Sequence, residues 1–348
     1  MRILAITSTP DRPELALLCG LAKAGHAITV LCENPKSIPS KKNLEASELF
    51  IKSRFDLSAI KRIKELFTSK QFDIVHSFSA RALTSALFAT RGGSVRHVAY
   101  RGTVGHLSRW DPLSRLSFLS PRVSKISCVS NAVRDYMTSL GVPRARTATI
   151  YKGHDVNWYS APPTETRASL GIPPNTVLGA FLGNMRRVKG ADILIDALDK
   201  LPDSIHILLI GAVRDSVVAK KLSASGAQKR VHALGFREDG AGLLKLCDFF
   251  VMPSREREGF PKAVIEAMAQ KVAPIVTNVG GMPEQVEDEI SGLIVPANDA
   301  TALASAIIKL SSDSKLCVRV GEAARARVAS SFTVERTVKE TLELYNSL

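Results

Sequence analysis

Short apolar segments alternate with amphipathic helical patterns along most of the chain, and this alternation restricts the fold more than any other feature. Their apolar residues are consecutive, as in strands that are buried on both faces of a parallel sheet. Repeated strand–helix units predict a doubly wound α/β fold, and two sets of six predict two such domains. The predicted strands are Ile3–Thr7, Ala27–Leu31, Ile74–His76, His97–Tyr100, Ile126–Val129 and Thr149–Tyr151, followed by Val177–Leu182, Ile205–Ile210, Val231–Leu234, Phe249–Met252, Ala273–Thr277 and Leu293–Val295.

The break between the two sets falls in Ser160–Asn175, which contains four prolines and little apolar periodicity. We therefore assign residues 1–165 to a first domain and residues 166–331 to a second. Residues 332–348 have apolar side chains at helical spacing and predict a final helix. A chain of 348 residues is long enough for two domains of ordinary size.

Positive charge is concentrated in the first domain. Residues 1–160 hold 24 Lys and Arg against 11 Asp and Glu, a net charge of +13, whereas the rest of the chain carries only +1. An anionic membrane surface or a phosphorylated polymer would explain this surplus, and so would a solvated basic face. Aromatic residues are not interleaved with these cations, which argues against nucleic-acid binding.

Composition also restricts the cellular setting and the chemistry. The five cysteines form no C-x-x-C pair, which favours free thiols in a reducing cytoplasm. We expect no signal peptide, because the first apolar run is short and lacks a small-residue cleavage site, and no membrane span, because no apolar stretch approaches about 18 residues. The chain has no D-x-D, no P-loop pattern and no H-x-x-x-H pair. We therefore expect no bound metal and no dinucleotide cofactor.

The segment Pro253–Ala269 carries two carboxylates, Glu258 and Glu266, on either side of a Gly-Phe-Pro turn. Pro261 suits the first position of a helix, where its missing N–H costs nothing. The following N–H groups, from Lys262 onward, would then be free to bind an anion. A phosphate at this helix start would have a carboxylate on each side, and carboxylates accept hydrogen bonds from hydroxyls. This arrangement predicts a nucleotide-sugar site.

The same segment resembles the donor-binding signature of the retaining glycosyltransferases of family 4, which have the GT-B fold. Gly183–Gly190 (G-N-M-R-R-V-K-G), Gly280–Glu284 (G-G-M-P-E) and Ser291–Pro296 (S-G-L-I-V-P) are similar to further motifs of that family, in the same order. The resemblance is sharper after residue 175 than before it. It implies two Rossmann-like domains, the first for the acceptor and the second for the donor, with a last helix that crosses back to the first domain.

The resemblance also implies roles for residues of the second domain. Lys189 matches a phosphate-contacting lysine of the family, Glu258 a glutamate near the donor sugar, and Glu266 a glutamate that binds the ribose. The family has an arginine at the position of Asn184, so Arg186 or Arg187 would have to replace it here. The remaining candidates bind the donor through the backbone or line its site: Gly183 at the start of the first motif, Gly235 and Phe236 near the base, and Gly259, Phe260, Pro261, Lys262 and Ala263 at the helix start.

The first domain departs from the family pattern. Family members often have a histidine after the fourth strand, close to the donor sugar, whereas this chain has Y-R-G-T-V-G-H. Arg101 stands at the expected position and His106 follows five residues later. Either side chain could face the donor, so the acceptor side is less well determined than the donor side.

The implied activity is transfer of a sugar from a nucleotide-sugar to a saccharide or lipid-linked acceptor, with retention and without a metal or other cofactor. The lack of a membrane span and the basic first domain suggest bacterial surface polysaccharide or lipopolysaccharide assembly, in the cytoplasm or peripherally on the inner membrane face. Two alternatives remain. One is another GT-B enzyme, such as a nucleotide-sugar epimerase, and the other is a non-catalytic GT-B subunit that binds anionic partners.

Overall fold

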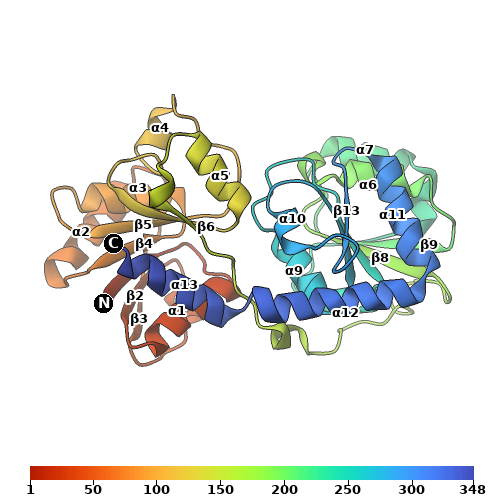
Figure 1. Cartoon of the computed structure of the whole chain (residues 1–348), viewed down its shortest axis with the longest axis horizontal. Helices are drawn as coiled ribbons and strands as arrows, with labels where there is room; N and C mark the ends of the chain where they lie inside the picture. Colours follow the sequence, from red (N-terminus) through yellow and green to blue (C-terminus); the bar gives the residue numbers. More distant parts are fainter. The chain divides into compact units, whose positions relative to one another are not determined.

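The computed structural model describes all residues from 1 to 348, and they fold into two units. The first unit consists of Met1–Gly153 and Phe332–Leu348, and the second of His154–Ser331 (Figure 1). Each unit has one parallel sheet covered by helices on both faces, so the predicted doubly wound class is confirmed for both. No helix has the length and apolar character that crossing a bilayer requires.

The sheet of the first unit has seven strands in the order β3-β2-β1-β4-β5-β6-β7, all parallel. Ile3 on the central strand β1 lies opposite Ile28 on β2 and Ile74 on β4, so that apolar residues line up across the sheet. The order reverses between β1 and β4, which is where open α/β sheets bind ligands. The strands are β1 Arg2–Ile6, β2 Ala27–Cys32, β3 Leu44–Glu48, β4 Ile74–Ser77, β5 Arg96–Arg101, β6 Val123–Cys128 and β7 Thr147–Thr149.

Helices cover both faces of this sheet, and each face has its own buried core. One core joins the sheet to α1 and α13, and the other joins it to α2 and α3. Asp11 and Asp56 begin α1 and α2 by accepting hydrogen bonds from the first free N–H groups. The helices are α1 Arg12–Lys23, α2 Leu57–Ser69, α3 Ala80–Ala89, α4 Pro112–Arg115, α5 Asn131–Ser139 and α13 Val334–Asn346.

The last helix, α13, belongs to the first unit although it follows the whole second unit in sequence. It packs along α1 at Gly20, where a Cβ atom would lie 2.4 Å from a methyl group of Val338. The Tyr345 hydroxyl lies 2.7 Å from Nδ1 of the buried His76 on β4. The final residues are therefore a structural part of the first core.

The second unit repeats the architecture with six strands in the order β10-β9-β8-β11-β12-β13, also all parallel. Its order reverses between β8 and β11. The strands are β8 Val177–Leu182, β9 Ile205–Ile210, β10 Val231–Gly235, β11 Phe249–Met252, β12 Ala273–Thr277 and β13 Leu293–Val295. The helices are α6 Ala191–Leu198, α7 Ser216–Ala224, α8 Gly240–Leu243, α9 Lys262–Ala269, α10 Met282–Gln285, α11 Ala300–Ser312 and α12 Ser314–Ser331.

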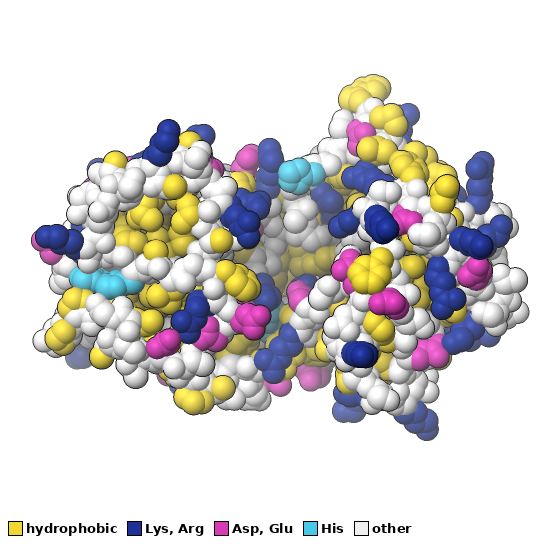
Figure 2. Space-filling model, turned by 180° about the vertical axis from the view of Figure 1, so that it is seen from behind, with side chains coloured by type: hydrophobic (Ala, Val, Ile, Leu, Met, Phe, Trp, Pro, Cys, Tyr) yellow, Lys and Arg dark blue, Asp and Glu magenta, His cyan; other side chains and the backbone are white.

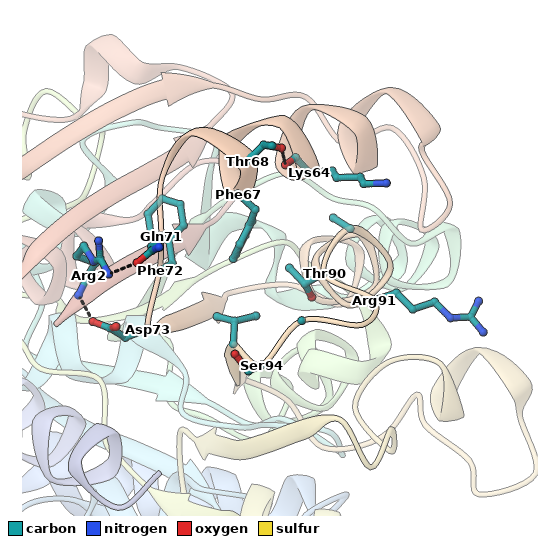
Figure 3. Close-up of a pocket in the computed structure, with 13 residues that line it drawn as sticks. Arg2, Lys64, Phe67, Thr68, Gln71, Phe72, Asp73, Thr90, Arg91 and Ser94 are labelled. Carbon is teal, nitrogen blue, oxygen red and sulfur yellow. Dashed lines mark hydrogen bonds between the residues drawn. The ribbon is translucent and has the colours of Figure 1, made fainter.

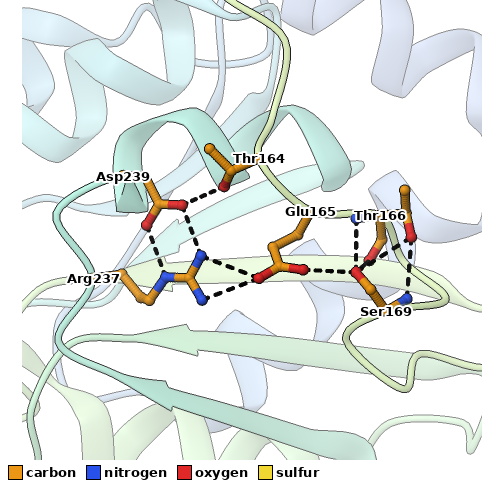
Figure 4. A network of polar contacts seen from close by, with 6 residues as sticks. All are labelled: Thr164, Glu165, Thr166, Ser169, Arg237 and Asp239. Atoms are coloured by element: carbon orange, nitrogen blue, oxygen red, sulfur yellow. Dashed lines mark hydrogen bonds and ion pairs between the residues drawn. The ribbon is translucent and has the colours of Figure 1, made fainter.

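The predicted boundary after residue 165 lies too late, because residues 154–165 belong to the second unit. The Lys245 ammonium donates to the carbonyls of Ser160 and Ala161, at 2.8 and 2.5 Å. Figure 4 shows the next residues docked on the same unit: the Arg237 guanidinium bridges Glu165 and Asp239, and Thr164 also donates to Asp239. These polar contacts could not be read from a segment that looks like a linker.

The first sheet differs from the prediction at both of its edges. Strand β3, with the sequence L-E-A-S-E, was not predicted because its polar residues interrupt the apolar run, as an edge strand allows. Strand β7 begins and ends two residues before the predicted Thr149–Tyr151. The second sheet follows the prediction closely, because five of its predicted strands have the observed bounds and the sixth, β10, extends one residue further.

Candidate functional site

The two most distinctive motifs of the sequence leave neighbouring strands at the point where the second sheet reverses its order. Residues 183–190 follow β8, and residues 253–269 follow β11. Ligands of open α/β sheets bind outside the carboxyl ends of the strands at such a point. Topology therefore brings the two motifs to one place, although about seventy residues separate them in sequence.

Gly190 allows the two loops to touch. Its φ of +69° is a left-handed conformation, and a Cβ atom there would lie 1.8 Å from the Pro253 carbonyl oxygen. The Arg255 N–H donates to the Val188 carbonyl at 3.0 Å, which joins the loops next to this glycine. Any other residue at position 190 would force the loops apart and would move Lys189 with them.

Lys189 and Glu258 form the ion pair at the centre of the site. The Lys189 ammonium lies 2.6 Å from Oε1 of Glu258, and the Ser254 hydroxyl donates to the same oxygen at 2.6 Å. The Glu258 side chain is 7% exposed and that of Lys189 is 35% exposed. The carboxylate is thus held under the surface while the ammonium remains accessible, so a ligand anion can approach the lysine.

The G-G-M-P-E motif holds the backbone of the same glutamate. A Cβ atom on Gly280 would lie 1.9 Å from the Glu258 carbonyl oxygen, and Gly281 donates its N–H to that oxygen at 3.3 Å. The predicted motif therefore supports Glu258 from behind.

Helix α9 begins one residue later than predicted. Pro261 is its N-cap residue instead of its first helical residue, and the Val264 N–H donates to the Pro261 carbonyl at 3.2 Å. No side chain caps the helix, so the N–H groups of Lys262 and Ala263 point outward from the helix start. One fewer backbone N–H group than predicted is therefore free to bind an anion at the start of α9.

Glu266 lies one turn into α9, with its side chain 9% exposed. The Lys262 ammonium, one turn earlier on the same face, lies 3.3 Å from its Oε1, and the lysine side chain is half exposed. The structure thus places one buried carboxylate on each side of the α9 start, as the E-x7-E spacing predicted, with a lysine against each of them.

The arginines of the first motif differ in their surroundings. Met185 is buried, whereas its neighbours Asn184 and Arg186 are exposed, so these two residues lie on the same side of the extended segment. Arg187 instead lies near Asp192, with its Nε 3.9 Å from Oδ2 of that residue. Of the two candidates, Arg186 is therefore the better substitute for an arginine at position 184.

Gly183 and Gly235 end strands β8 and β10 at the same edge of the sheet. Both have positive φ values, +146° and +67°, which glycine tolerates. The Gly235 carbonyl accepts a hydrogen bond from Gly211 at 2.7 Å, and the next residue, Phe236, is 75% exposed. The ring of Phe236 is available to a ligand because nothing in this unit covers it.

Arg101 and His106 belong to the first unit, at the carboxyl end of β5. The Arg101 guanidinium is 5.0 Å from the Phe118 ring and donates to the Gly105 carbonyl, and burial lowers its pKa. His106 is exposed and has a φ of +63°. Arg101 therefore braces the loop that presents His106, and the two residues have different roles in one loop.

Sequence reasoning missed a buried polar cluster at the reversal point of the first sheet. The Lys152 ammonium lies 2.5 Å from Oδ2 of Asp11 and 5.6 Å from the centre of the Tyr100 ring. Next to them, burial raises the pKa of Glu14 to about 7, although a hydrogen bond to Thr7 opposes the shift. Glu14, Tyr100 and Lys152 also line a cavity of about 20 Å³. The available signal was an Asp and a Glu three apart at the start of a predicted helix, directly after the first strand.

A cavity of about 650 Å³ lies beside the amino ends of β1, β4 and β5 in the same unit (Figure 3). Arg2 is held there by its own neighbours, since it donates to Gln71 and Asp73. The Lys64 and Arg91 side chains point away from the cavity. Neither unit has a group of three or more His, Cys, Asp or Glu residues that could hold a metal ion.

Two family models match the chain. The one described as glycosyl transferases group 1 matches residues 163–327, and the one described as glycosyltransferase family 4 matches residues 15–158. The HepE structure of Anabaena, in complex with UDP, has a TM-score of 0.83 and 21% identity, and the match covers all of both chains.

Two curated relatives represent the matches in sequence. The UDP-Gal:alpha-D-GlcNAc-diphosphoundecaprenol alpha-1,3-galactosyltransferase of Escherichia coli is 22% identical, over 83% of this chain and 79% of its own length. The lipopolysaccharide core mannosyltransferase LpcC of Rhizobium leguminosarum is 30% identical, over 52% of this chain and 53% of its own length. For most of the curated relatives, the match spans only about half of their length.

Proposed function

Because the chain belongs to the glycosyltransferases of family 4 and has their GT-B fold, we propose that it transfers a sugar from a nucleoside diphosphate sugar with retention of configuration. The acceptor is a saccharide or a lipid-linked saccharide of bacterial lipopolysaccharide or surface polysaccharide assembly. The expected location is the cytoplasm, with the protein peripheral on the inner membrane face. The relatives act in reactions of this kind, according to their names.

One observation carries the donor assignment: two buried glutamates flank the uncapped start of α9, and Lys189 faces the same place. The N–H groups of Lys262 and Ala263, together with Lys189, supply positive charge for a diphosphate. Glu266 can accept two hydrogen bonds from a ribose diol, and Glu258 can accept one from a sugar hydroxyl. The exposed Phe236 at the end of β10 offers a surface to the base.

The proposed reaction breaks the bond between the anomeric carbon and the oxygen of the β-phosphate. The electron pair of this bond goes to the diphosphate, and Lys189 and the helix start stabilise the charge that develops there. The acceptor hydroxyl attacks the anomeric carbon from the face that the phosphate leaves, and its proton passes to the departing phosphate oxygen. The products are a glycoside and a nucleoside diphosphate.

The test is an assay of the whole protein with a panel of nucleotide-sugars, in the presence and absence of EDTA. We expect slow release of nucleoside diphosphate from one donor, faster release with a saccharide acceptor, and no loss of rate in EDTA. NMR of the product should show the anomeric configuration of the donor. Lys189→Ala should lower the rate of release. Lys271→Ala is its matched control, because Lys271 pairs with Glu322 on the surface. Inversion, or strict dependence on added Mg²⁺ or Mn²⁺, would contradict the proposal.

The same assay separates the two alternatives. A nucleotide-sugar epimerase would convert one nucleotide-sugar into another through the sugar and would form no glycoside. A non-catalytic subunit would bind nucleotide without turnover of any donor. The ion pair of Lys189 and the burial of both glutamates favour the transferase over the non-catalytic subunit.

A further inference from the structure

Two short segments of the first unit expose large apolar side chains. Phe50, Phe55 and Leu57 lie between β3 and the start of α2, and Trp110 lies just before α4. Leu57 is 78% exposed and Trp110 is 81% exposed. We call the exposed apolar residues of both segments the apolar patch; its members are Phe50, Phe55, Leu57, Trp110, Leu113 and Leu116.

Phe88 of α3 lies between the two segments and links them into one surface. The Phe55 ring packs edge-on against Phe88 of α3, with 5.6 Å between ring centres. Phe88 and Leu116 line one cavity of about 220 Å³, so the second segment reaches the ring that Phe55 contacts. In Figure 2 hydrophobic side chains gather at the top of the first unit, where Figure 1 places α4, with Lys and Arg side chains beside them.

The charge that accompanies the patch has one dominant sign. Lys52 and Arg54 belong to the first segment, and Arg109 and Arg115 to the second. The acidic residues of these segments, Asp56 and Asp111, cap α2 and α4 with their carboxylates and are therefore directed into the backbone. Cations thus accompany the apolar residues in both segments, and the nearby acids are engaged in hydrogen bonds.

We propose that the apolar patch inserts into the headgroup region of an anionic lipid bilayer, with its cations bound to the lipid phosphates. Bulky apolar side chains with Trp at the water boundary and Lys or Arg beside them are what such an interface requires. A symmetric dimer through the patch is less suitable, because a two-fold axis would bring the same cations against each other. The inference deepens the proposed peripheral location by naming the surface that binds, concerns the first unit alone, and does not depend on the proposed transfer reaction.

The apolar patch includes only some of the cations of the first unit, so binding through the patch can be distinguished from binding through net charge. Lys41 and Lys42 precede β3 whereas Phe50 follows it, so a five-residue strand, roughly 17 Å long, separates them from the patch. The pair Lys41→Glu and Lys42→Glu therefore changes the charge as much as Arg109→Glu and Arg115→Glu, but away from the patch.

The test measures sedimentation of the full chain with vesicles of phosphatidylcholine alone or mixed with phosphatidylglycerol. We expect binding to the mixed vesicles only. The double variant Trp110→Ser and Leu113→Ser should lower the partition coefficient at least about tenfold, since each side chain loses its apolar burial. Arg109→Glu with Arg115→Glu should lower it by about fivefold or more for each cation lost, and Lys41→Glu with Lys42→Glu by clearly less.

A fluorescence measurement separates insertion from adsorption. The chain has two tryptophans, so Trp158→Phe leaves Trp110 as the reporter. We expect its emission to shift to the blue, and brominated lipids to quench it, on mixed vesicles. Binding without such a shift, equal binding to both kinds of vesicle, or equal losses in the two charge-reversal pairs would overturn the proposal. So would sedimentation velocity that shows a dimer in the parent and a monomer in the Trp110→Ser, Leu113→Ser variant, with no vesicle binding by either.

Discussion

The two sheets have their order reversals at equivalent places, yet the polar groups there are arranged differently. In the second unit the Lys189 ammonium is accessible above the buried Glu258. In the first unit Lys152 is bound to Asp11, and Glu14 beside it is 8% exposed. At the reversal point of the second sheet the cation is therefore more exposed than the carboxylate it pairs with, whereas at that of the first sheet Lys152 is less exposed than Asp11 and Glu14 is buried.

This difference shows that one topology can serve two purposes. At the reversal point of the second sheet, the start of α9 has uncapped N–H groups that can bind an anion, and two glycines allow close backbone approaches. At the reversal point of the first sheet, burial raises the pKa of Glu14 to about 7, so this carboxyl changes its protonation near neutral pH in the folded protein. We therefore expect mutations at the reversal point of the second sheet to affect mainly turnover. Mutations at that of the first sheet should affect mainly stability and its dependence on pH.

The largest expected effect is that of Lys189→Ala on turnover. The negative charge on the diphosphate grows as the glycosidic bond breaks, so the lysine stabilises the transition state more than the bound donor. We expect kcat to fall by about 10²–10³-fold and the Kd of the nucleotide to rise much less. Steady-state kinetics and calorimetry measure the two quantities. A rise in Kd as large as the fall in kcat would show that the lysine binds donor and transition state equally.

The next largest effect is that of Glu14, in the first unit, on the pH dependence of stability. Unfolded Glu14 releases its proton near pH 4.5, whereas folded Glu14 keeps it up to about pH 7. Its contribution to stability is therefore complete below pH 4.5 and is lost as the pH rises to 7, with a cost of about 3 kcal/mol above that. Glu14→Gln should stabilise the protein by a similar amount at pH 8 and by little at pH 4.5.

This prediction is measured as the difference between Glu14→Gln and the parent in urea unfolding across that pH range. The difference is needed because burial lowers the pKa of His76 to about 3 and that of His97 to about 4. Those histidines destabilise the folded state as the pH falls below 6.5, which opposes the effect of Glu14. A difference that does not change with pH would mean that Glu14 ionises normally in the folded protein.

The fold was largely predictable from the sequence because its strands are consecutive apolar runs. Where the strand is an edge, as β3 is, the pattern weakens, since polar residues are tolerated on the outside. The domain boundary was misplaced for a different reason. Residues 160–165 dock through Lys245 and Arg237, which are distant in sequence, and no local pattern reports such contacts.

The candidate site was predictable only where chemistry and local structure coincide. The spacing of Glu258 and Glu266 around a helix start placed both carboxylates, because a strand–loop–helix unit fixes their positions. The sequence did not distinguish Arg186 from Arg187, whereas the structure places Arg186 on the same exposed side of the segment as Asn184, opposite the buried Met185. The Glu14 cluster could not be predicted, because the pKa shift arises mainly from burial in the folded protein and Lys152, which opposes it, is distant in sequence.

A smaller effect is expected for Glu266→Ala. Charge-assisted hydrogen bonds to the ribose contribute about 1.5–3 kcal/mol, so nucleotide affinity should fall at least about tenfold while the fold is retained. Lys262→Ala is the matched control, because it removes the partner of Glu266 but not the carboxylate. Calorimetry with the nucleoside diphosphate measures both variants. If Lys262→Ala weakens binding as much as Glu266→Ala, the lysine and not the carboxylate is the main contact.

The smallest effect tests which unit owns residues 154–165. Arg237 joins Glu165 to Asp239, and hydrogen bonds from Arg237 and Thr164 hold the pKa of Asp239 well below its usual range. The Arg237 side chain is 30% exposed, so solvent screens these ion pairs.

Arg237→Gln should therefore lower the melting temperature of the second unit by no more than about 3 °C and leave that of the first unchanged. Scanning calorimetry of the whole chain measures both transitions. Arg62→Gln is the control, because Arg62 forms an exposed ion pair with Glu65. In the Glu165→Gln background the Arg237 substitution should cost less, because one of its two partners is already neutral. A shift confined to the transition of the first unit would instead attach residues 154–165 to that unit, and the boundary would return towards residue 165.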